Sequence, residues 1–570
     1  MPSRREFIAA TFAAFASSLG AATNPARPYL QSLSKSSATL VWMTPDPGPS
    51  RLDFGPEGAP SHPITPTSRF FAPQQTGLPH GFWLHEAKLT GLLPQTLYRY
   101  QSTGSPAATF RTPGSGRSRI VVFGDSGAET DAQRQLATRM TARQPDLILH
   151  TGDLVYPVGN ADNYLRKYFA LYQELFATAP AFPCPGNHDY YHAGGQMFVE
   201  FNKVPRDSVP EAGHGRYYSF DWENAHIVVL DSNTPLEEAA AGRGEMLEWL
   251  ERDLTATTAY WRIAMFHHPP YAGGPNQDDP LSELVRQHLV PILERHHVDL
   301  VFNGHEHNYQ RSHPINGIVY LTSGGGGAMI YPTIPRAEAA IQHARHHFLE
   351  AELTPTSLRV DAIDVDGHLL DTLTLKPAPR LLSPLLSSAC GTIAAAVGGL
   401  ATIMGRSFSA GVRVRVNGHP ATMIYSNASQ INVRLPDGIT GPAHLQVETS
   451  NGQAELTYDI ARTAPAIFVG AVFTANDRRV TASEPAQRGE RLSVYFTGRG
   501  HGEQVTARLG DSVLTVYCES QAGIDRADFT LEGSGDFVLV IDGVTSNAIP
   551  IPSRALPTAP AVGHILQDST

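Results

Sequence analysis

Between residues 117 and 376, continuous apolar runs alternate with segments of helical periodicity, and this alternation constrains the fold more than any other feature of the chain. The apolar runs lie at 120–123, 146–150, 226–230, 261–266 and 298–302, and the apolar side chains between 281 and 293 fall on one helical face. Continuous apolar strands that alternate with helices are typical of layered α/β domains with buried sheets. We therefore expect a central α/β domain over residues 117–376.

Five short polar motifs each follow an apolar stretch of this domain directly. They contain Asp125, Asp153 with Tyr156, Asn187 with His188, His267, and His305 with His307. The carboxyl ends of the strands in an α/β sheet gather at one edge, where ligand sites form. We expect these side chains to converge there, although each motif alone is a weak indication of function.

The residue types favour a site for two metal ions. Carboxylate and phenolate oxygens suit a hard trivalent ion, whereas imidazole and amide groups suit a borderline divalent ion. Glycines flank the motifs at 124, 152, 186 and 304, where they allow the backbone to approach the site closely.

The order of these motifs resembles that of the calcineurin-like metallophosphoesterases, and Asp153 followed three positions later by Tyr156 narrows the resemblance to the purple acid phosphatases. The resemblance covers about residues 27–376 and implies a fibronectin-like β-sandwich before a central α/β metallophosphoesterase sandwich. It also implies a ligand set: Asp125, Tyr156 and His307 on Fe(III), Asp153 bridging, and Asn187, His267 and His305 on a divalent partner (Zn, Mn or Fe). His188 would lie near the substrate.

Charge is consistent with this arrangement. Three anionic ligands against a 3+ and a 2+ ion leave about two positive charges, enough to hold a hydroxide and a phosphate ester. We therefore predict an exported phosphomonoesterase, an acid phosphatase, in which metal-bound hydroxide attacks a phosphate ester. The alternatives are a phosphodiesterase or nucleotidase of the same superfamily, or a non-catalytic surface-binding protein whose metal site is only structural.

Several neighbours of the site are open to more than one interpretation. His188 either orients the phosphate, protonates the leaving group or stabilises its loop, and Asp189 either tunes His188 or caps the next helix. His268 either contacts a ligand residue or packs. Plant-type enzymes carry two further histidines after the His-x-Pro motif, but residues 271–279 here contain none. Asn276 or Gln277 could donate hydrogen bonds instead.

Segments outside the central domain have β-type patterning. Short alternating stretches with Pro- and Gly-rich turns predict a sandwich over 24–114, and a Pro-rich linker at 377–384 precedes a C-terminal module at 385–552. A weak repeat that aligns Tyr425 with Tyr517 predicts two similar sandwiches divided near 465, followed by a tail at 553–570. The fold class is therefore multidomain: a fibronectin-like sandwich, the α/β domain and a tandem β-sandwich.

The C-terminal module resembles a β-sandwich found on many exported bacterial proteins, notably in Acidobacteria. Its residues contain no clustered carboxylates, metal-ligand spacing or nucleophile motif. It is interpreted either as a spacer or as a module that contacts carbohydrate or a surface.

The N-terminus predicts export. Arg4 and Arg5 precede a short apolar run and small residues, which is typical of a signal peptide over 1–23, of the twin-arginine type or an ordinary secretory signal. We expect a periplasmic or extracellular protein without a transmembrane anchor, because the uncharged 381–405 stretch is rich in small residues. A net charge of −11 argues against a nucleic-acid scaffold as partner, and three distant cysteines allow at most one disulfide, Cys390–Cys518.

Overall fold

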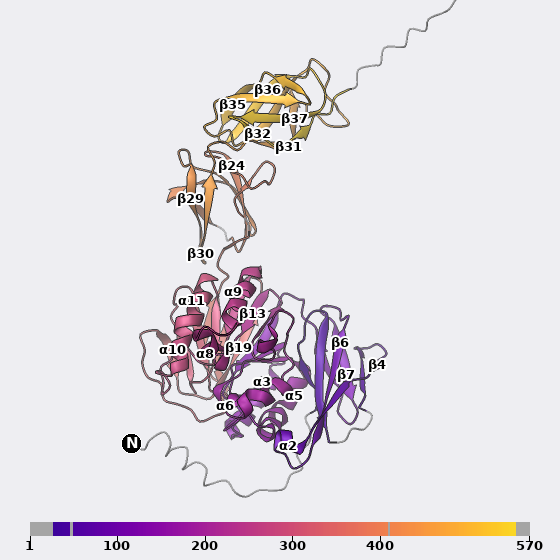
Figure 1. The fold of residues 1–570 in the computed structure, drawn as a ribbon, viewed down its shortest axis with the longest axis vertical. Coiled ribbons are helices and arrows are strands. Elements are labelled where there is room, and N and C mark those ends of the chain that lie inside the picture. The colour runs from indigo at the N-terminus through magenta and orange to yellow at the C-terminus, as the bar shows by residue number, and fades with distance from the viewer. Residues whose placement is uncertain (1–26, 46–49, 383, 409–410, 555–570) are drawn as a thin grey trace, which may run out of the picture. The chain divides into compact units, whose positions relative to one another are not determined.

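The computed structural model describes residues 27–45, 50–382, 384–408 and 411–554, in two compact units, 1–375 and 376–570. The predicted signal peptide and nearly all of the predicted tail lie outside these residues. Among the described residues, no helix has the length and apolar character needed to cross a bilayer. The multidomain fold class is confirmed, with β-sandwiches on either side of an α/β domain in the sequence (Figure 1).

The first unit begins with a sandwich of two four-stranded antiparallel sheets. One sheet has the order β1 (Tyr29–Gln31), β2 (Ser37–Thr44), β6 (Phe82–Thr90), β5 (Thr67–Phe71); the other has the order β4 (His62–Ile64), β3 (Leu52–Pro56), β7 (Leu97–Ser102), β8 (Ala108–Arg111). A short helix, α2 (Pro73–Thr76), joins β5 to β6. Alternating burial along β6 and β7 explains the alternating sequence pattern, because one face of each strand packs inside the sandwich.

The α/β domain contains two mixed sheets. The six-stranded sheet has the order β11 (Ala181–Pro183), β10 (Leu147–His150), β9 (Ser118–Phe123), β19 (His347–Leu353), β20 (Leu358–Asp364), β21 (Leu369–Leu375). The seven-stranded sheet has the order β12 (Tyr218–Trp222), β13 (Ala225–Val229), β14 (Trp261–Met265), β15 (Leu300–Asn303), β17 (Val319–Ser323), β16 (Tyr309–Ser312), β18 (Ala339–His343). Strands β9, β10 and β11 are parallel, as are β13, β14, β15 and β17, so each sheet presents a row of carboxyl ends.

Helices accompany both sheets. They are α3 (Asp131–Ala142), α4 (Ala161–Asn163), α5 (Ala170–Thr178), α6 (Asn187–Tyr190), α7 (Gln196–Phe201), α8 (Thr234–Ala240), α9 (Met246–Ala256), α10 (Pro280–Leu284) and α11 (Val290–Arg295). π-Helical turns at Tyr164–Phe169 and Val285–Leu289 join α4 to α5 and α10 to α11. The helical pattern expected between 281 and 293 thus corresponds to one nearly continuous helical segment.

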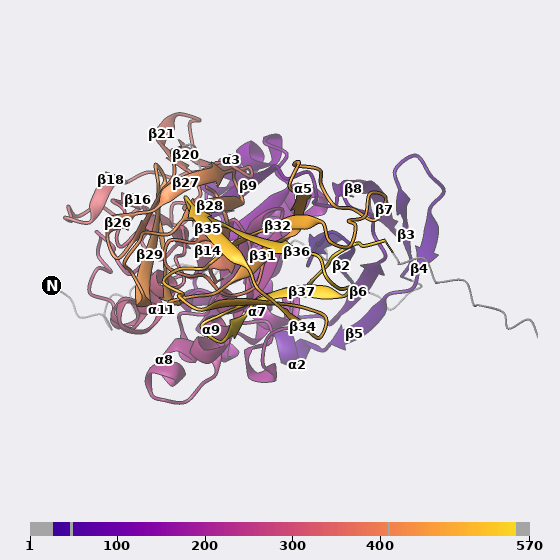
Figure 2. The same ribbon diagram turned by 90° about the horizontal axis from the view of Figure 1, so that it is seen from above.

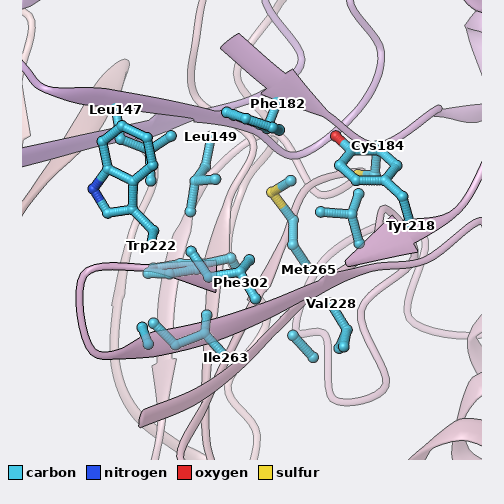
Figure 3. Close-up of a cluster of buried hydrophobic side chains, with 14 of the residues drawn as sticks. Leu147, Leu149, Phe182, Cys184, Tyr218, Trp222, Val228, Ile263, Met265 and Phe302 are labelled. Atoms are coloured by element: carbon cyan, nitrogen blue, oxygen red, sulfur yellow. The ribbon is translucent and has the colours of Figure 1, made fainter. Parts of the chain in front are cut away.

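Strands alternate their side chains between two cores. Ile120 and Val122 of β9 belong to the large core between the sheets, whereas Val121 and Phe123 pack with residues of α3 and α5. Figure 3 shows the large core, where Leu149 and Phe182 of one sheet approach residues of the other. Because both faces of these strands are buried, their sequences are continuous apolar runs.

The N-terminal sandwich packs directly on the α/β domain. Helix α5 contacts β1 and β8, and it lies beside β8 in Figure 2. The Tyr100 hydroxyl donates to the carbonyl of Ala177 at 2.7 Å. At the connection, the Glu223 carboxylate accepts hydrogen bonds from the backbone N–H groups of Gly114, Ser115 and Gly116. These contacts fix the sandwich to the α/β domain.

The second unit contains two consecutive sandwiches. The first pairs the sheet β22 (Arg380–Leu381), β24 (Leu400–Arg406), β28 (Gln430–Arg434), β27 (Thr422–Ser426), with β23 (Leu386–Ser387) on β24, against β26 (His419–Pro420), β25 (Arg413–Val416), β29 (Gly441–Thr449), β30 (Gly452–Ile460). The second pairs β31 (Ala466–Thr474), β32 (Arg491–Thr497), β36 (Ile524–Thr530), β35 (Tyr517–Gln521) against β34 (Ser512–Leu514), β33 (Val505–Leu509), β37 (Asp536–Ile541), β38 (Val544–Thr545), with β39 (Ile549–Pro550) on β37.

Three observations bear on what the sequence predicted for the linker, the repeat and the cysteines. Strand β22 lies within the segment interpreted as a linker, because its two residues pair with β24. Tyr425 and Tyr517 occupy equivalent edge strands, β27 and β35. Cys184, Cys390 and Cys518 are all free thiols, so the disulfide that the sequence allowed between Cys390 and Cys518 is not formed.

Candidate metal centre

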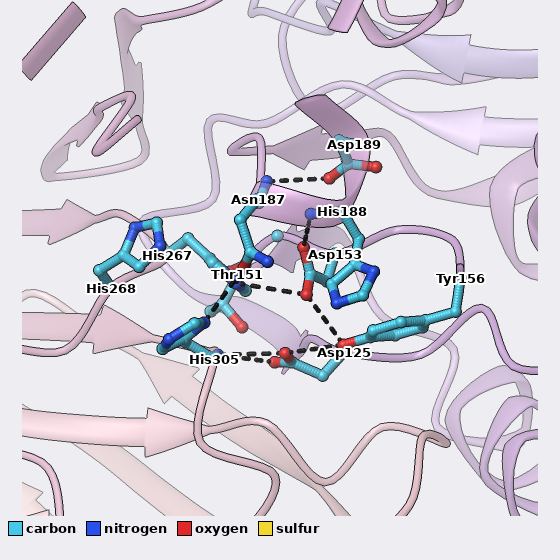
Figure 4. Close-up of polar contacts among 12 residues, drawn as sticks. Asp125, Thr151, Asp153, Tyr156, Asn187, His188, Asp189, His267, His268 and His305 are labelled. Atoms are coloured by element: carbon cyan, nitrogen blue, oxygen red, sulfur yellow. Dashed lines mark hydrogen bonds and ion pairs between the residues drawn. The ribbon is translucent and has the colours of Figure 1, made fainter. Parts of the chain in front are cut away.

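The polar motifs converge where the two rows of carboxyl ends meet. Asp125 follows β9, Asp153 follows β10, Asn187 begins α6 after β11, His267 follows β14, and His305 follows β15. Figure 4 shows Asp125, Asp153, Tyr156, Asn187 and His305 pointing toward one another. The structure therefore brings the whole predicted set together in one place.

Four of the predicted ligands form one group around the Tyr156 hydroxyl. This hydroxyl donates to Asp125 Oδ1 at 3.1 Å and Asp153 Oδ2 at 3.0 Å, and it lies 2.9 Å from His307 Nε2. His307 Nε2 is also 3.4 Å from Asp125 Oδ1. Two carboxylates, a phenol and an imidazole thus present their ligand atoms to one point.

The remaining ligands form a second group around the Asn187 side-chain oxygen. This oxygen lies 3.2 Å from His267 Nε2 and 3.1 Å from His305 Nδ1. His267 Nε2 is also 3.5 Å from Asp153 Oδ2, so Asp153 joins both groups. Asp153 is therefore the residue that would touch both of two neighbouring ions.

Each imidazole of the predicted ligand set has an outer polar partner at its other nitrogen. His267 Nδ1 donates to the carbonyl of Thr151 and His307 Nδ1 to the carbonyl of Met329, each at 2.8 Å. His305 is reversed: Nδ1 faces the site and Nε2 lies 3.4 Å from Asp279 Oδ2. Metal-binding histidines generally have such outer partners, which fix the tautomer and the ring orientation.

The backbone is strained at three of these residues. Asp125, Asp153 and His305 have φ values of 56°, 52° and 68°, in the left-handed region that non-glycine residues rarely occupy. A Cβ at Gly186 would lie 2.1 Å from Asp153 Oδ1, and one at Gly304 would lie 2.6 Å from Asp125 Oδ2. Such strain clusters at functional sites, and the two glycines leave room for the carboxylates.

The electrostatics of the protein groups favour a bound cation. Burial by itself lowers the pKa of His267, yet the carboxylates of Asp153 and Asp125 raise it to about 10. Burial and the same two carboxylates hold the pKa of Tyr156 well above its usual value, so its phenolate needs a nearby positive ion. Burial also raises the pKa of Asp153, but the neighbouring His267 outweighs it and holds this pKa well below its usual value.

The ligand atoms fit metal ions in spacing and in chemistry. Metal–ligand bonds of about 2.1 Å at near-right angles separate adjacent ligand atoms by about 3 Å. Asp125, Asp153 and His267 form a buried group whose ligand atoms lie within 4.8 Å of one another, and so do His267, His268 and His305. The residues present therefore match a centre for two ions.

A cavity of about 450 Å³ opens beside these groups. Its wall includes Asp153, Asn187, His188, His305 and His307. His188 Nδ1 donates to the carbonyl of Pro157 at 2.7 Å, which leaves Nε2 for a ligand, and the His188 ring packs on Tyr156 at 4.4 Å. A cavity of this size suits a small molecule.

Three neighbours of the site have defined roles. The buried Asp189 carboxylate accepts from the N–H groups of Gly186 and Leu154 and from the Tyr164 hydroxyl, so it caps its own helix, α6, and not a following one. His268 Nδ1 bonds the Ser232 hydroxyl and its ring contacts His305. The Asn276 amide donates to the carbonyl of His305, while Gln277 lies outside the cavity wall.

Sequence reasoning did not assign several residues of the cavity wall to the site, and four of them have polar or aromatic side chains that the proposals below use: Asp279, Tyr191, Tyr331 and Glu237. Asp279 ends the histidine-free segment that was compared with the plant enzymes, and it also caps α10 through the N–H of Leu281. None of the four belongs to a motif, and only the proximity of Tyr191 to Asn187 in sequence was a signal.

Comparison with known proteins agrees with this geometry. A family model for calcineurin-like phosphoesterases matches residues 118–309, and one for IPT/TIG domains matches residues 387–461. Mouse acid phosphatase type 7 is 26% identical over 384 residues, covering 58% of this chain and 86% of its own length. Purple acid phosphatase 15 of Arabidopsis thaliana is 27% identical, covering 46% of this chain and 55% of its own length.

Among solved structures, a purple acid phosphatase from yellow lupin (Lupinus luteus) seeds superposes with a TM-score of 0.56 at 18% identity. The superposition covers 62% of this chain and 74% of the lupin chain, and it supports the fold. The predicted resemblance is confirmed for the central domain, whereas the Acidobacterial resemblance of the C-terminal module stays a prediction. Residues 118–309 are a calcineurin-like metallophosphoesterase domain, and the relatives of the chain include purple acid phosphatases.

Proposed function

We propose that this hydrolase is a two-metal phosphomonoesterase of the purple acid phosphatase type. The observation that carries the proposal is the sharing of Asp153 between two groups of ligand atoms, one with Tyr156 and one with Asn187. A structural metal site would not need two such groups beside an open cavity.

The chemistry of the two groups differs, and so would their ions. Asp125, Tyr156 and His307 with Asp153 form an anionic, oxygen-rich set that suits Fe(III). Asn187, His267 and His305 with Asp153 form a set of lower charge that suits Zn, Mn or Fe as a divalent ion. When bound, such a pair supplies Lewis acidity, which lowers the pKa of water and offsets charge on phosphoryl oxygens.

The protein groups would then bind and orient the ester. In the hydrolysis, water gives up a proton to solvent and its oxygen forms a bond to phosphorus while the bond from phosphorus to the alcohol oxygen breaks, and the alcohol oxygen takes up a proton. His188 Nε2 is the nitrogen oriented toward the cavity, where it either holds a phosphoryl oxygen or supplies that proton. The wall around it keeps the reacting groups beside the ligand residues.

The same machinery could serve diesters or nucleotides, which are the alternatives to a monoester. A panel of monoesters, diesters and nucleotides, tested on the iron- and zinc-loaded full chain before and after chelation, separates them. The proposal predicts hydrolysis of monoesters that chelation abolishes and metal restores. Activity on diesters alone would move the assignment to a phosphodiesterase, and activity that is unaffected by chelation would contradict the metal mechanism.

Export to the periplasm or the medium is also part of the proposal, and it rests on the Arg4–Arg5 signal pattern. The C-terminal unit contains an IPT/TIG match, and the role of this unit as a spacer or a carbohydrate- or surface-contacting module remains a prediction.

A further inference from the structure

The cavity wall extends beyond the proposed metal ligands, to residues that could face the alcohol part of a bound ester. Glu237 of α8 and the rings of Tyr191 and Tyr331 line this wall, the two tyrosines beside Asn187 and His307. The role of these three residues rests on the proposed phosphomonoesterase function.

The charged side chains of the cavity wall, apart from its histidines, are acidic. Among the described residues that line the cavity, no lysine or arginine is present, while Glu237 and Asp279 add carboxylates beyond the proposed ligands. Asp279 is paired with His305 Nε2 at 3.4 Å. Glu237 is exposed, and within the described part of the chain its carboxylate joins no ion pair, so its charge is available to a bound molecule.

The two tyrosines present fixed aromatic faces. Tyr331 stacks on the His307 imidazole with ring centroids 4.1 Å apart and an interplanar angle of 7°. The Tyr191 hydroxyl accepts a hydrogen bond from the Asn187 amide at 2.8 Å, and its side chain remains 59% exposed. The negative face of an aromatic ring attracts a cation, most strongly where the cation loses water.

We propose that Glu237, Tyr191 and Tyr331 form a leaving-group subsite that selects phosphomonoesters of cationic alcohols, such as alkylammonium alcohols. Esters of neutral alcohols are accepted, and esters whose alcohol carries a second negative charge are disfavoured. The phosphoryl group itself binds at the metal centre, so selection by charge acts on the alcohol alone.

The expected selectivity follows from the Coulomb interaction between the exposed Glu237 carboxylate and a charge on the alcohol part of the ester. One unit charge placed within several ångströms of Glu237 changes binding on the order of threefold to tenfold, because water and salt screen an exposed carboxylate. The effect should shrink as salt rises, since the screening length is only about 10 Å at 0.1 M. The net charge of −11 also repels esters that carry an additional negative charge, and so it adds to the same preference at long range.

The test uses three esters of nearly equal size on the metal-loaded full chain: 2-aminoethyl phosphate, ethyl phosphate and phosphoglycolate. The intrinsic reactivities of the three alcohols differ, so each kcat/KM is compared between variants, where those differences cancel. The variants are Glu237→Gln and Glu237→Lys, with Glu238→Gln as the matched control, because Glu238 is also exposed on α8 but does not line the cavity.

We expect the ratio of aminoethyl to carboxymethyl ester hydrolysis to fall about threefold to tenfold in Glu237→Gln, further in Glu237→Lys, and not in Glu238→Gln. The effect should diminish at 1 M salt. A ratio within twofold of wild type in Glu237→Lys would overturn the subsite, as would an equal change in Glu238→Gln. If ethyl phosphate is still hydrolysed when the subsite is overturned, the proposed function survives. If the wild type hydrolyses no ester, that function fails and the subsite fails with it.

Discussion

Replacing Asp279 by asparagine should weaken the binding of one of the two proposed metal ions without unfolding the site. Asp279 Oδ2 lies 3.4 Å from His305 Nε2, and His305 Nδ1 faces the Asn187 oxygen. The carboxylate therefore fixes which nitrogen of His305 points at the divalent position. Asparagine keeps the side-chain oxygen that caps α10 through the N–H of Leu281, so the helix should be preserved.

The magnitude follows from the geometry of this pair. Two unit charges 3.4 Å apart attract by about 5 kcal/mol at an effective dielectric constant of about 20, which is a ceiling. The imidazole carries only part of a charge, although the two side chains are only 10% and 19% exposed and screening is limited. Loss of such an outer partner typically costs 10- to 100-fold in metal affinity, or about 1.4–2.8 kcal/mol.

Competition against a chelator of known affinity measures this loss directly. Asp279→Asn should release one ion at 10- to 100-fold lower chelator concentration than wild type, and the second ion should follow the wild-type curve. Asp278→Asn is the control, because Asp278 is an exposed neighbour that does not line the cavity. Affinities within twofold of wild type in Asp279→Asn, or equal losses in both variants, would refute the role of Asp279.

Three further predictions concern the metal ligands, the fold and the domain division. Tyr156→Phe should abolish the violet absorption expected of an Fe(III)–phenolate pair while leaving circular dichroism unchanged, because only one oxygen is removed; a colourless wild type loaded with iron would contradict this. Burial by itself lowers the pKa of His226, but hydrogen bonds to Asp221 and Asp253 raise it to about 9. Because this folded value lies above the unfolded value of about 6.5, the stabilisation is complete below pH 6.5 and is lost as pH rises to 9. The shift corresponds to a stabilisation of about 3 kcal/mol at most, reduced to about 2 kcal/mol because the Asp221 side chain is 77% exposed. In urea unfolding between pH 6 and 9, the free energy of unfolding of the wild type should fall by this much more than that of His226→Gln. Equal losses in the two proteins would contradict the prediction. A chain ending at Leu375 should keep both metals and its activity on small esters, since all proposed ligands lie in the first compact unit; loss of both would show that the second unit completes the site.

The sequence was sufficient for the features that have a local signal. The convergence of the proposed ligands at the ends of β9, β10, β14 and β15 could be predicted because a buried parallel strand is recognisable as an apolar run and its next residues must reach the sheet edge. The Asp153–Tyr156 spacing carried the family resemblance. The sandwiches were recognisable because half-buried strands alternate polar and apolar residues.

Features that depend on the path of a loop had no such signal. Asp279 reaches His305 only because the segment after His267 folds back over the site and is held there by bonds from Asn276 to His305 and Glu306. Tyr331 stacks on His307 from a loop after β17. Strand β22 could not be predicted for a related reason. Its two residues lie in a Pro-rich stretch and form a strand only because they pair with β24.

The central claim is that two metal ions share Asp153, and metal content tests it most directly. Mass spectrometric metal analysis of the purified full chain, reloaded with iron and zinc, should give about two ions per chain with at least one iron. Asp153→Asn should lose both ions together, because the bridging carboxylate contacts both ligand groups. One ion or none in the wild type, or two retained in Asp153→Asn, would contradict the claim.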